Sequence, residues 1–535
     1  MEIRTTLRAI RRHGPFLFKQ LFRRAPKLVR ATIETASLEH GKIVLTGHIM
    51  ANYTPHSCHF ILRKFRDETI TQSFPINILG PAKFTLAKKI SFFIGFRWDR
   101  FSVLIDFPWQ DMPSSIYGMG FQCGDQTSHP KLAPGTAQIL TDDLAKRTYC
   151  LFVEPSVQVP RIEMYHFGSD VLAGLKHHAM APRNKKLNCV IGEYSNAARD
   201  NGRVFFEWLK EAKSSIHASY IVEQNNNEDY SVDQTGVLTF GTIEHLKACI
   251  DAHICVFTHH RNYVYPYILH FVASDRYRST KTLFLQHGVI AMKTNIVSHY
   301  HYNRAHFDGF VVSSEKEKEI IVKYFGYPSS HLFVTGLARF DRLFQKSQIE
   351  TTPCEQVLIF PTWRVGLEKK TPIQISQTPF ILQWQQAMIG VRKTGIRTVL
   401  ILHPLLHRHA EHFTHCVDEI RSPNTFQDTL LESVALITDY SSVSFDALYA
   451  KKPVFLFQFD QAGVSKIKQV FVNVKTQLPG MLSRDLNTLI SQIESARLDN
   501  WAFKHHAQSN LYFENCDAKN CARIENVIIK LANKY

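Results

Sequence analysis

Hydrophobic residues alternate with polar ones in the first third of the chain and gather into short continuous runs in the rest. From about Ala31 to Arg183, segments such as ATIETASLEHGKIVLTGHIMA and RFSVLIDF alternate with a period of two, and turn residues separate them. Such alternation is typical of strands that bury one face. It predicts a β-rich, sandwich-like domain over residues 31–183.

After residue 184 the pattern changes to apolar runs separated by helical segments. A first series reads LNCVIGE, ASYIVEQ, AHICVFTHH, TLFLQHG, GFVVSS and HLFVTG, and a second reads QVLIFPTWR, TVLILHP, ALITDYSS and PVFLFQFD. Near-continuous apolar strands joined by helices indicate parallel sheets covered on both faces. We predict an α/β protein with two Rossmann-like domains, 184–345 and 346–535, facing one another across a cleft.

The first thirty residues hold nine Lys/Arg and one Glu, and so half of the formal net charge of +16. Apolar residues such as Leu7, Ile10 and Phe18 lie between the basic ones, as in a helix on anionic lipid. A solvated tail and a nucleic-acid arm are alternatives, because charge alone does not select a partner. The apolar residues favour an arm, residues 1–30, that binds an anionic membrane surface and no nucleic acid.

Two further features of the sequence indicate where in the cell the protein lies. No apolar run reaches the roughly 20 residues of a spanning helix, and the arm lacks the apolar core of a signal peptide. We therefore expect a cytoplasmic protein, peripheral on the inner face of the cell membrane.

The ten cysteines form no C-x-x-C pair, which favours reduced thiols in cores over a zinc ribbon.

The candidates for chemistry lie at the ends of the predicted strands, because ligands of open parallel sheets bind beyond the carboxyl ends. His287 ends TLFLQHG, and a histidine followed by Gly288 suits a general base. His403 ends TVLILHP. Each histidine alone fits a loop hydrogen bond equally well. The histidines between 403 and 415 suggest a metal site as an alternative interpretation. They complete no H-E-x-x-H pattern, however.

Other strand ends suit anion binding. Thr362, Trp363 and Arg364 end QVLIFPTWR, where an aromatic ring would flank a base and an arginine would hold phosphate. Ser441 and Ser442 lie where a strand gives way to a helix, whose free N–H groups favour an anion. The alternatives are a buried tryptophan with a surface arginine, and an ordinary helix cap.

The segment TGLARFDRL adds Arg339 and Asp341 at the junction of the two α/β units. Ion pairing within the chain and a functional role are about equally consistent with this segment.

Five motifs together resemble a known family. Taken in order, QHG, GLARFD, PTWR, HP and TDYSSVSFDALYAKKPVFLF resemble the glycerophosphotransferase family of teichoic-acid synthesis over about residues 189–459. The chain departs from that family at Gln286, where the best-known members have tryptophan, and at Ala338, where they commonly have proline.

The resemblance implies a GT-B-like fold whose C-terminal unit holds the nucleotide. It implies a transferase that moves an alditol phosphate, with glycerol phosphate as first choice, from CDP-glycerol or CDP-ribitol to a hydroxyl of a polymer or lipid-linked acceptor, releasing CMP. His287 would take the proton of that hydroxyl. Four residues would hold the diphosphate and stabilise the charge on departing CMP: His403, Arg364, Ser441 and Ser442. Thr362 and Trp363 would border the cytidine. Arg339 and Asp341 would orient a substrate. Asp439 belongs to the substrate-binding loop, and a structural role suits it and Asp446 better than a catalytic one.

Phosphoryl transfer needs positioning and charge stabilisation, which cationic groups and N–H donors can supply. The sequence shows no clear acidic metal-binding pair, so we predict no cofactor and no essential divalent cation. Two other functions fit the same fold: a GT-B glycosyltransferase or nucleotide-sugar epimerase, and an inactive membrane-surface scaffold that binds carbohydrate.

Overall fold

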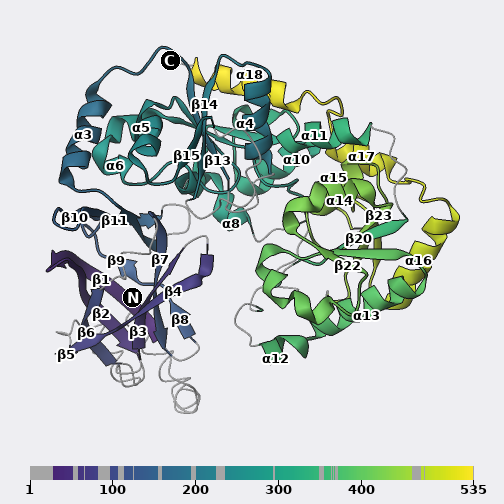
Figure 1. The fold of residues 1–535 in the computed structure, drawn as a ribbon, viewed down its shortest axis with the longest axis horizontal. Coiled ribbons are helices and arrows are strands. Elements are labelled where there is room, and N and C mark those ends of the chain that lie inside the picture. The colour runs from purple at the N-terminus through teal and green to yellow at the C-terminus, as the bar shows by residue number, and fades with distance from the viewer. Residues whose placement is uncertain are drawn as a thin grey trace, which may run out of the picture.

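The computed structural model describes residues 28–51, 58–64, 67–81, 97–105, 114–123, 126–154, 159–193, 200–223, 235–292, 296–348, 355–362, 364, 367, 372–460, 471–474 and 476–533. They form a β-rich region followed by two α/β units (Figure 1). Residues 1–27 of the basic arm and Trp363 lie outside the described residues. Within the described ranges, no helix is long and apolar enough to cross a membrane.

Two sheets face one another in the β-rich region. Their strand orders are β5-β6-β2-β1-β9 and β10-β11-β12-β7-β3-β4, and β8 pairs with β7. The strands are β1 (Leu28–Glu39), β2 (Lys42–Ala51), β3 (Cys58–Lys64), β4 (Asp67–Pro75), β5 (Asn77–Pro81), β6 (Arg97–Ile105), β7 (Ser115–Cys123), β8 (Gln126–Ser128), β9 (Lys131–Leu132), β10 (Gln138–Asp142), β11 (Arg147–Glu154) and β12 (Val159–Tyr165). Phe101 of one sheet meets Phe121 of the other edge to face, so the period-two pattern buries its apolar residues between the sheets.

One cysteine differs from the expectation of reduced thiols. Cys58 is disulfide-bonded. Cys58 begins β3, which runs antiparallel to β7. The free cysteines among the described residues are Cys150, Cys189, Cys249, Cys255, Cys416, Cys516 and Cys521. All but Cys516 are buried, as is typical of small apolar side chains in a core.

The first α/β unit contains seven parallel strands in the order β15-β14-β13-β16-β17-β18-β19. They are β13 (Asn188–Gly192), β14 (His217–Val222), β15 (Val237–Thr239), β16 (Ile254–Phe257), β17 (Lys281–Phe284), β18 (Gly309–Val312) and β19 (Leu332–Val334). The order reverses between β13 and β16, as in a doubly wound sheet. Its helices are α3 (Ser169–Met180), α4 (Asn201–Glu211), α5 (Ile243–Asp251), η2 (Arg261–Tyr263), α6 (Leu269–Val272), α7 (Ser274–Ser279), α8 (Val297–Tyr300), α9 (Tyr302–Ala305), α10 (Glu315–Ile320), η3 (Ile321–Phe325), η4 (Ser329–His331) and α11 (Ala338–Ser347).

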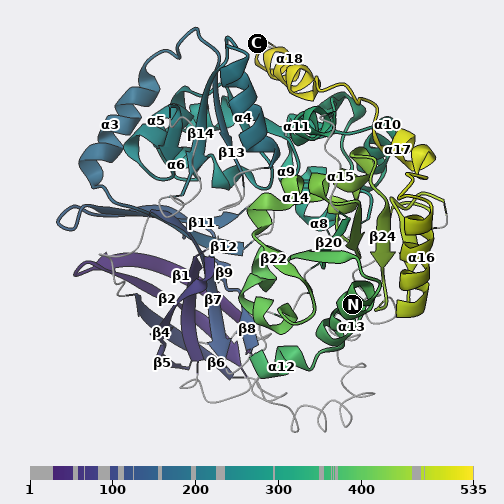
Figure 2. The same cartoon turned by 45° about the vertical axis from the view of Figure 1, so that its right-hand side comes forward.

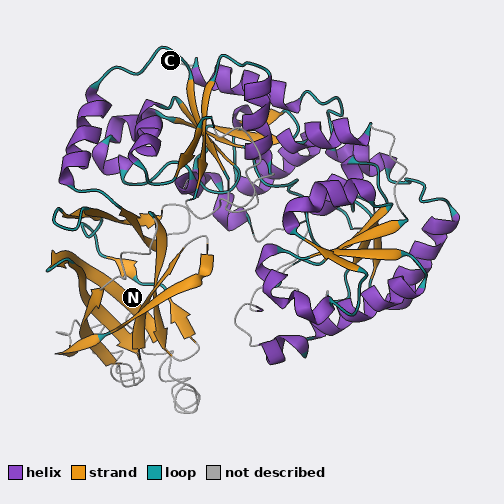
Figure 3. Cartoon of the chain, in the orientation of Figure 1, coloured by secondary structure: helices purple, strands orange, loops and turns teal. Residues whose placement is uncertain are grey.

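The second α/β unit repeats this arrangement with six parallel strands, ordered β22-β21-β20-β23-β24-β25. They are β20 (Gln356–Phe360), β21 (Arg397–Ile401), β22 (Glu419–Arg421), β23 (Ala435–Thr438), β24 (Val454–Phe457) and β25 (Met481–Ser483). Here the order reverses between β20 and β23. The helices are α12 (Pro372–Ser376), α13 (Pro379–Lys393), η6 (Pro404–Phe413), η7 (Pro423–Thr425), α14 (Phe426–Glu432), α15 (Val443–Tyr449), α16 (Leu486–Leu498), α17 (His506–Tyr512) and α18 (Asn520–Ala532). Figure 3 shows helices on both faces of each parallel sheet.

Two helices cross the predicted domain boundaries. Helix α18 follows the second unit in sequence but packs on α11 and on β16, β17 and β18 of the first unit. Figures 1 and 2 both show it beside α4. Helix α3 precedes residue 184 and packs on α5 and α6. The first unit is therefore completed by segments from both sides of its predicted range.

Candidate active site

A cavity of about 560 Å³ lies between the two α/β units, and all three regions contribute to its wall. The second unit contributes Phe360, His403, Ser441, Ser442 and Val443. The histidines of the first unit on the wall are His259, His260, His287 and His299. His259 follows β16 and Ser441 follows β23, so the cavity lies beyond the switch points of both sheets.

The loop after β17 carries His287 to the cavity wall. The preceding residue, Gln286, has a left-handed φ of 50° and is fully buried. Its Nε2 donates to the Val311 carbonyl at 3.0 Å and to Glu317 at 3.1 Å. Glu317 also accepts the Ile290 N–H at 2.6 Å, and burial raises its pKa. The glutamine that replaces the family's tryptophan thus anchors the loop that presents His287.

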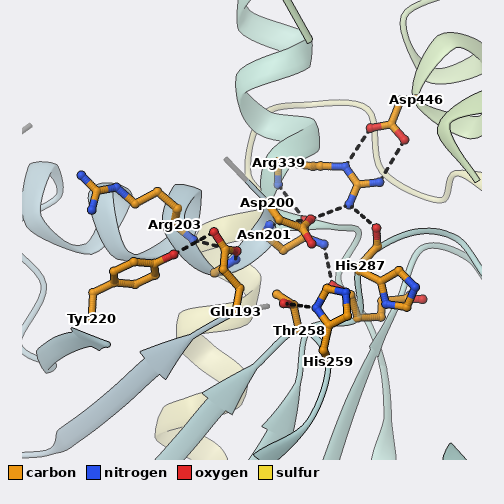
Figure 4. A network of polar contacts seen from close by, with 12 residues as sticks. Glu193, Asp200, Asn201, Arg203, Tyr220, Thr258, His259, His287, Arg339 and Asp446 are labelled. Carbon is orange, nitrogen blue, oxygen red and sulfur yellow. Dashed lines mark hydrogen bonds and ion pairs between the residues drawn. The ribbon is translucent and has the colours of Figure 1, made fainter. Parts of the chain in front are cut away.

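Two further contacts hold this loop. The Nδ2 of Asn201 donates to the Gln286 carbonyl at 2.8 Å, and its Oδ1 accepts the Arg339 N–H at 3.1 Å. The His287 ring stacks on His259 with the ring centres 4.5 Å apart and the planes 14° apart. Figure 4 shows the two rings side by side. The imidazole of His287 is therefore positioned by both its backbone and its ring.

Arg339 connects the two α/β units. Its guanidinium makes two bonds to Asp446 of the second unit, at 2.7 and 2.9 Å, and one to Asp200 of the first, at 2.9 Å (Figure 4). It also donates to the His287 carbonyl at 3.0 Å. Burial lowers the pKa of Arg339, but the two carboxylates outweigh burial and raise it, so the residue stays charged.

A buried acid, Glu193, and a half-buried one, Asp200, lie at the switch point of the first unit. Glu193 accepts the Tyr220 hydroxyl at 2.7 Å and the Gly202 N–H at 3.1 Å, which caps α4. Burial, followed by the charge of Asp200, raises the pKa of Glu193. Burial also raises the pKa of Asp200, against the opposing effect of Arg339. Both carboxylates accept backbone N–H groups at the start of α4, where Asn201 lies.

The second unit has its own buried ion pairs. Asp439 is fully buried, accepts the Thr362 N–H at 3.0 Å and pairs with Arg364 at 2.5 Å. The Nε of Arg364 pairs with Asp460 at 2.9 Å. Arg364 does not line the cavity. The contacts of Arg364 and Asp439 join the loops after β20 and β23, across the switch point of this sheet.

Ser442 brings the second unit against the His287 loop. A Cβ added to Gly288 would lie 2.6 Å from the Ser442 hydroxyl oxygen, so only a glycine leaves room for this approach. Ser441 is 6% exposed, and its carbonyl accepts the Ser444 hydroxyl at 2.7 Å. The two serines therefore lie opposite the candidate base.

Of the residues predicted from the sequence, His287, His403, Ser441 and Ser442 meet at the cavity. Asp341 does not reach it: its carboxylate accepts the N–H groups of Asn520 and Cys521 at the start of α18. The charged residues and histidines of the wall that the sequence analysis missed are Glu154, Arg161, His259, His260 and His299. His259 and His260 end the run AHICVFTHH, which is the same signal that singled out His287.

Several curated proteins of teichoic-acid synthesis are similar to this chain. The minor teichoic acid biosynthesis protein GgaB of Bacillus subtilis is 23% identical over 68% of this chain and 42% of its own length. The teichoic acid glycerol-phosphate primase of the same species is 26% identical over 35% of this chain and 49% of its own. The teichoic acid ribitol-phosphate primase of Bacillus spizizenii is 23% identical over 42% and 59%, respectively. The chain spans about half the length of these relatives.

A solved structure of a variant of the wall teichoic acid polymerase TagF shares the fold, with a TM-score of 0.50 and 15% identity over 67% of this chain and 91% of that one. The predicted fold is confirmed: a GT-B-like pair of Rossmann-like domains follows a β-rich region. Residues 176–530 match the family described as CDP-Glycerol:Poly(glycerophosphate) glycerophosphotransferase. The chain belongs to the CDP-glycerol:poly(glycerophosphate) glycerophosphotransferase family.

Proposed function

We propose that this protein transfers an alditol phosphate from a CDP-activated donor to a hydroxyl of a polymer or lipid-linked acceptor of the teichoic-acid type. The observation that carries the proposal is the cavity in which His287 of the first unit lies opposite His403, Ser441 and Ser442 of the second. The family match and the named relatives support this function over a glycosyltransferase, an epimerase or an inactive scaffold.

In the proposed reaction, the acceptor hydroxyl lies beside His287 and attacks the phosphorus that bears the alditol. His287 takes the hydroxyl proton as the new P–O bond forms, and the bond between the two phosphates breaks to release CMP. Ser441, Ser442 and His403 donate hydrogen bonds to the diphosphate and to the departing CMP. Arg339 and Arg364 act indirectly, because their ion pairs hold the loops that carry these groups.

Glycerol phosphate is the first candidate for the transferred group, and ribitol phosphate is the second. Relatives named for each alditol are similar to this chain. Purified protein incubated with CDP-glycerol or CDP-ribitol and a lipid-linked acceptor should release CMP from one of them. UDP-sugars serve as the control donors. UDP release without CMP release would assign the protein to sugar transfer, and release of neither would support the scaffold.

The two serines provide a separate test of the donor site. The Ser441→Ala/Ser442→Ala double variant should weaken binding of the CDP-alditol by about tenfold, because each hydroxyl contributes about 0.5–1.5 kcal/mol. Isothermal titration with the CDP-alditol measures the affinity. The exposed Ser491→Ala/Ser495→Ala pair on α16 is the matched control. Unchanged affinity in the cavity variant would limit the two serines to a structural role.

The basic arm leads to a proposal about location. We infer that it binds the protein to an anionic membrane surface from the cytoplasmic side, through its lysines and arginines. Because β1 begins at Leu28, deletion of residues 1–27 removes eight of the nine basic residues of the arm and leaves the strand intact. The truncated protein should no longer sediment with vesicles that contain anionic lipid. Sedimentation equal to that of the full chain would assign the membrane contact to another part of the protein.

A further inference from the structure

The β-rich region contributes two charged residues to the cavity, Glu154 at the end of β11 and Arg161 on β12. The Nε of Arg161 lies 2.8 Å from one oxygen of Glu154, and the other oxygen lies 3.1 Å from Nε2 of His260. Glu154 is 3% exposed. The chain of contacts Arg161–Glu154–His260 thus runs from the β-rich region to the first α/β unit at the cavity wall.

Buried contacts fix the β-rich region on the first unit. The carboxylate of Glu163, on the same strand as Arg161, accepts the N–H groups of Tyr267 and Ile268 at 2.7 and 2.9 Å. Phe152 stacks on Tyr267 with the ring centres 4.4 Å apart. Because Arg161 and Glu163 lie on the same regular strand, these contacts hold the backbone at Arg161 against the first unit.

A glycine on the neighbouring strand makes room for the guanidinium. Gly118 of β7 lies opposite Arg161 in the antiparallel register. A Cβ added there would lie 2.6 Å from Nη1 of Arg161. The side chain of Arg161 therefore passes over β7 at this glycine, and it lines the cavity.

Positive charge distinguishes Arg161 from the other residues of the wall. In the described part of the chain, it is the only lysine or arginine that lines the cavity. Arg339 and Arg364 lie outside the wall, in ion pairs with carboxylates. Burial lowers the pKa of His260, which favours its neutral form. A guanidinium keeps its charge at any physiological pH and matches the geometry of a phosphate.

We propose that the β-rich region forms a subsite for a phosphate of the acceptor chain, with Arg161 as the phosphate contact and Glu154 as its positioning residue. This proposal rests on the proposed function. In an acceptor made of alditol phosphates, one alditol separates the attacking hydroxyl from the nearest phosphate. His287 and Arg161 line the same cavity, so an acceptor bound at both extends its hydroxyl to the base and its phosphate to Arg161. The β-rich region lies almost entirely outside residues 176–530, so this subsite is an addition to the part of the chain that defines the family.

The role of His260 follows from its two ring nitrogens. Its Nδ1 accepts the Asn262 N–H at 3.2 Å, which leaves the proton of the neutral ring on Nε2, facing Glu154. His260 therefore orients Glu154, and through it Arg161.

The test compares Arg161→Ala with Arg100→Ala, which removes an exposed arginine from the same region. Loss of a charged contact to phosphate should raise the KM for an alditol-phosphate acceptor by about tenfold or more. The KM for the CDP-alditol should stay within about twofold, because the donor contacts lie on the second unit. Arg161→Lys should restore part of the loss. Arg100→Ala should match the wild-type protein.

A purely structural role of the pair is distinguished by Glu154→Gln. If Arg161 serves only to hold the two regions together, Glu154→Gln and Arg161→Ala should raise both KM values and lower the thermal midpoint alike. If Arg161 binds phosphate, Glu154→Gln keeps a side-chain oxygen that accepts from the Nε of Arg161 and removes a competing negative charge, so the KM for the acceptor should fall or stay the same. Equal acceptor defects in both variants would overturn the proposal.

Direct binding separates this proposal from the proposed function. A short oligo(glycerol phosphate) is titrated calorimetrically into wild type, Arg161→Ala and Arg100→Ala, with glycerol as the uncharged probe. Binding that Arg161→Ala weakens and added salt weakens further supports the subsite, even if no CDP donor yields CMP. CMP release with equal acceptor KM and equal oligomer affinity in all three proteins would reject the subsite and leave the proposed function standing.

Discussion

The two α/β units have the same strand order around their switch points, but they differ in how an arginine is held beside the cavity. Arg364 pairs with Asp439 and Asp460 of its own unit. Arg339 pairs with Asp200 of its own unit and with Asp446 of the other. Shared topology therefore determines where a site forms, whereas the partners of one arginine decide whether the site depends on contact between the units.

The units also present different chemistry to the cavity. The first unit contributes four histidines, and the second contributes one histidine and two serines. Four of the five imidazole rings lie on the wall of the first unit, and both serine hydroxyls lie on the wall of the second. This division is consistent with proton transfer on the side of the first unit and phosphate binding on the side of the second.

The largest expected effect tests this division with one histidine from each unit. His287→Ala should lower kcat by about 10²–10⁴-fold, the usual contribution of a general base, while the affinity for the CDP-alditol stays close to that of wild type. His403→Ala should weaken donor binding as well as turnover, because its ring lies on the wall of the second unit. Steady-state kinetics with separate donor titrations measure both.

The control for this pair is His177→Ala, which removes an exposed histidine from α3. It should leave both parameters unchanged. Near-normal turnover in His287→Ala would exclude this residue as the base, and a donor affinity unaffected by His403→Ala would remove the proposed difference between the two walls.

The next effect compares the two arginines. Arg339→Ala leaves Asp446 and Asp200 without their cation, and breaking a buried pair costs about 3–5 kcal/mol. Arg364→Ala should have a similar cost but act within the second unit only. Thermal unfolding measures stability, and small-angle X-ray scattering measures the arrangement of the units. Arg339→Ala should change both, and Arg364→Ala only the first. Equal scattering profiles for the two variants would contradict the connecting role of Arg339.

A smaller effect concerns the attachment of the β-rich region to the first unit. Burial raises the pKa of Glu163 from 4.5 to about 7, against the bonds from Tyr267, Tyr165 and Ile268. A raised pKa contributes stability that is full below the ordinary value and is lost as the pH rises through the folded value. This carboxyl should therefore make the protein less stable at pH 8 than at pH 5, by on the order of 3 kcal/mol.

Glu163→Gln tests that linkage, since an amide does not titrate in this range. Thermal midpoints of wild type and Glu163→Gln, measured from pH 5 to pH 8, should show a flatter profile for the variant. Glu525→Gln, in which the changed carboxylate accepts the hydroxyl of Ser214 outside this attachment, is the control. Parallel profiles for wild type and Glu163→Gln would show that Glu163 does not link attachment of the β-rich region to pH.

The smallest effect tests the contact between the units at Gly288. Gly288→Ala places a methyl group 2.6 Å from the Ser442 oxygen and should cost about 1–3 kcal/mol by overpacking. Adding Ser442→Ala should recover part of this loss, because the closest atom is then absent. Gly174→Ala on α3, where an added Cβ meets open space, should not destabilise the protein. A double variant no more stable than Gly288→Ala would exclude Ser442 as the source of the strain.

The sequence predicted most of the two sheets, because a buried parallel strand is apolar along its whole length. The runs that became β16, β17, β20, β23 and β24 were found directly. The short edge strands β15, β22 and β25 were missed, since three residues, most of them half-exposed, are too few to carry a periodic signal. The packing of α18 on the first unit was also missed, because local pattern does not specify which sheet a helix covers.

For the site, position at a strand end identified His287, His403, Ser441 and Ser442, which meet at the cavity. A strand end pointed to Arg364, and the family resemblance pointed to Arg339, as substrate-binding residues. In the structure both pair with carboxylates, which a sequence does not show. No sequence pattern marked Arg161 as a site residue. It lies in an alternating strand of a different region, and only the packing of that region on the first unit brings it to the cavity.

The chain passes between the two α/β units twice, once from α11 to β20 and once from α17 to α18. Helix α11 lies at both passages, since its Asp341 binds the start of α18 and its Arg339 binds Asp446. Both bonds lie in the first turn of α11. This one turn therefore fastens the first unit both to the second unit and to the helix that returns from it.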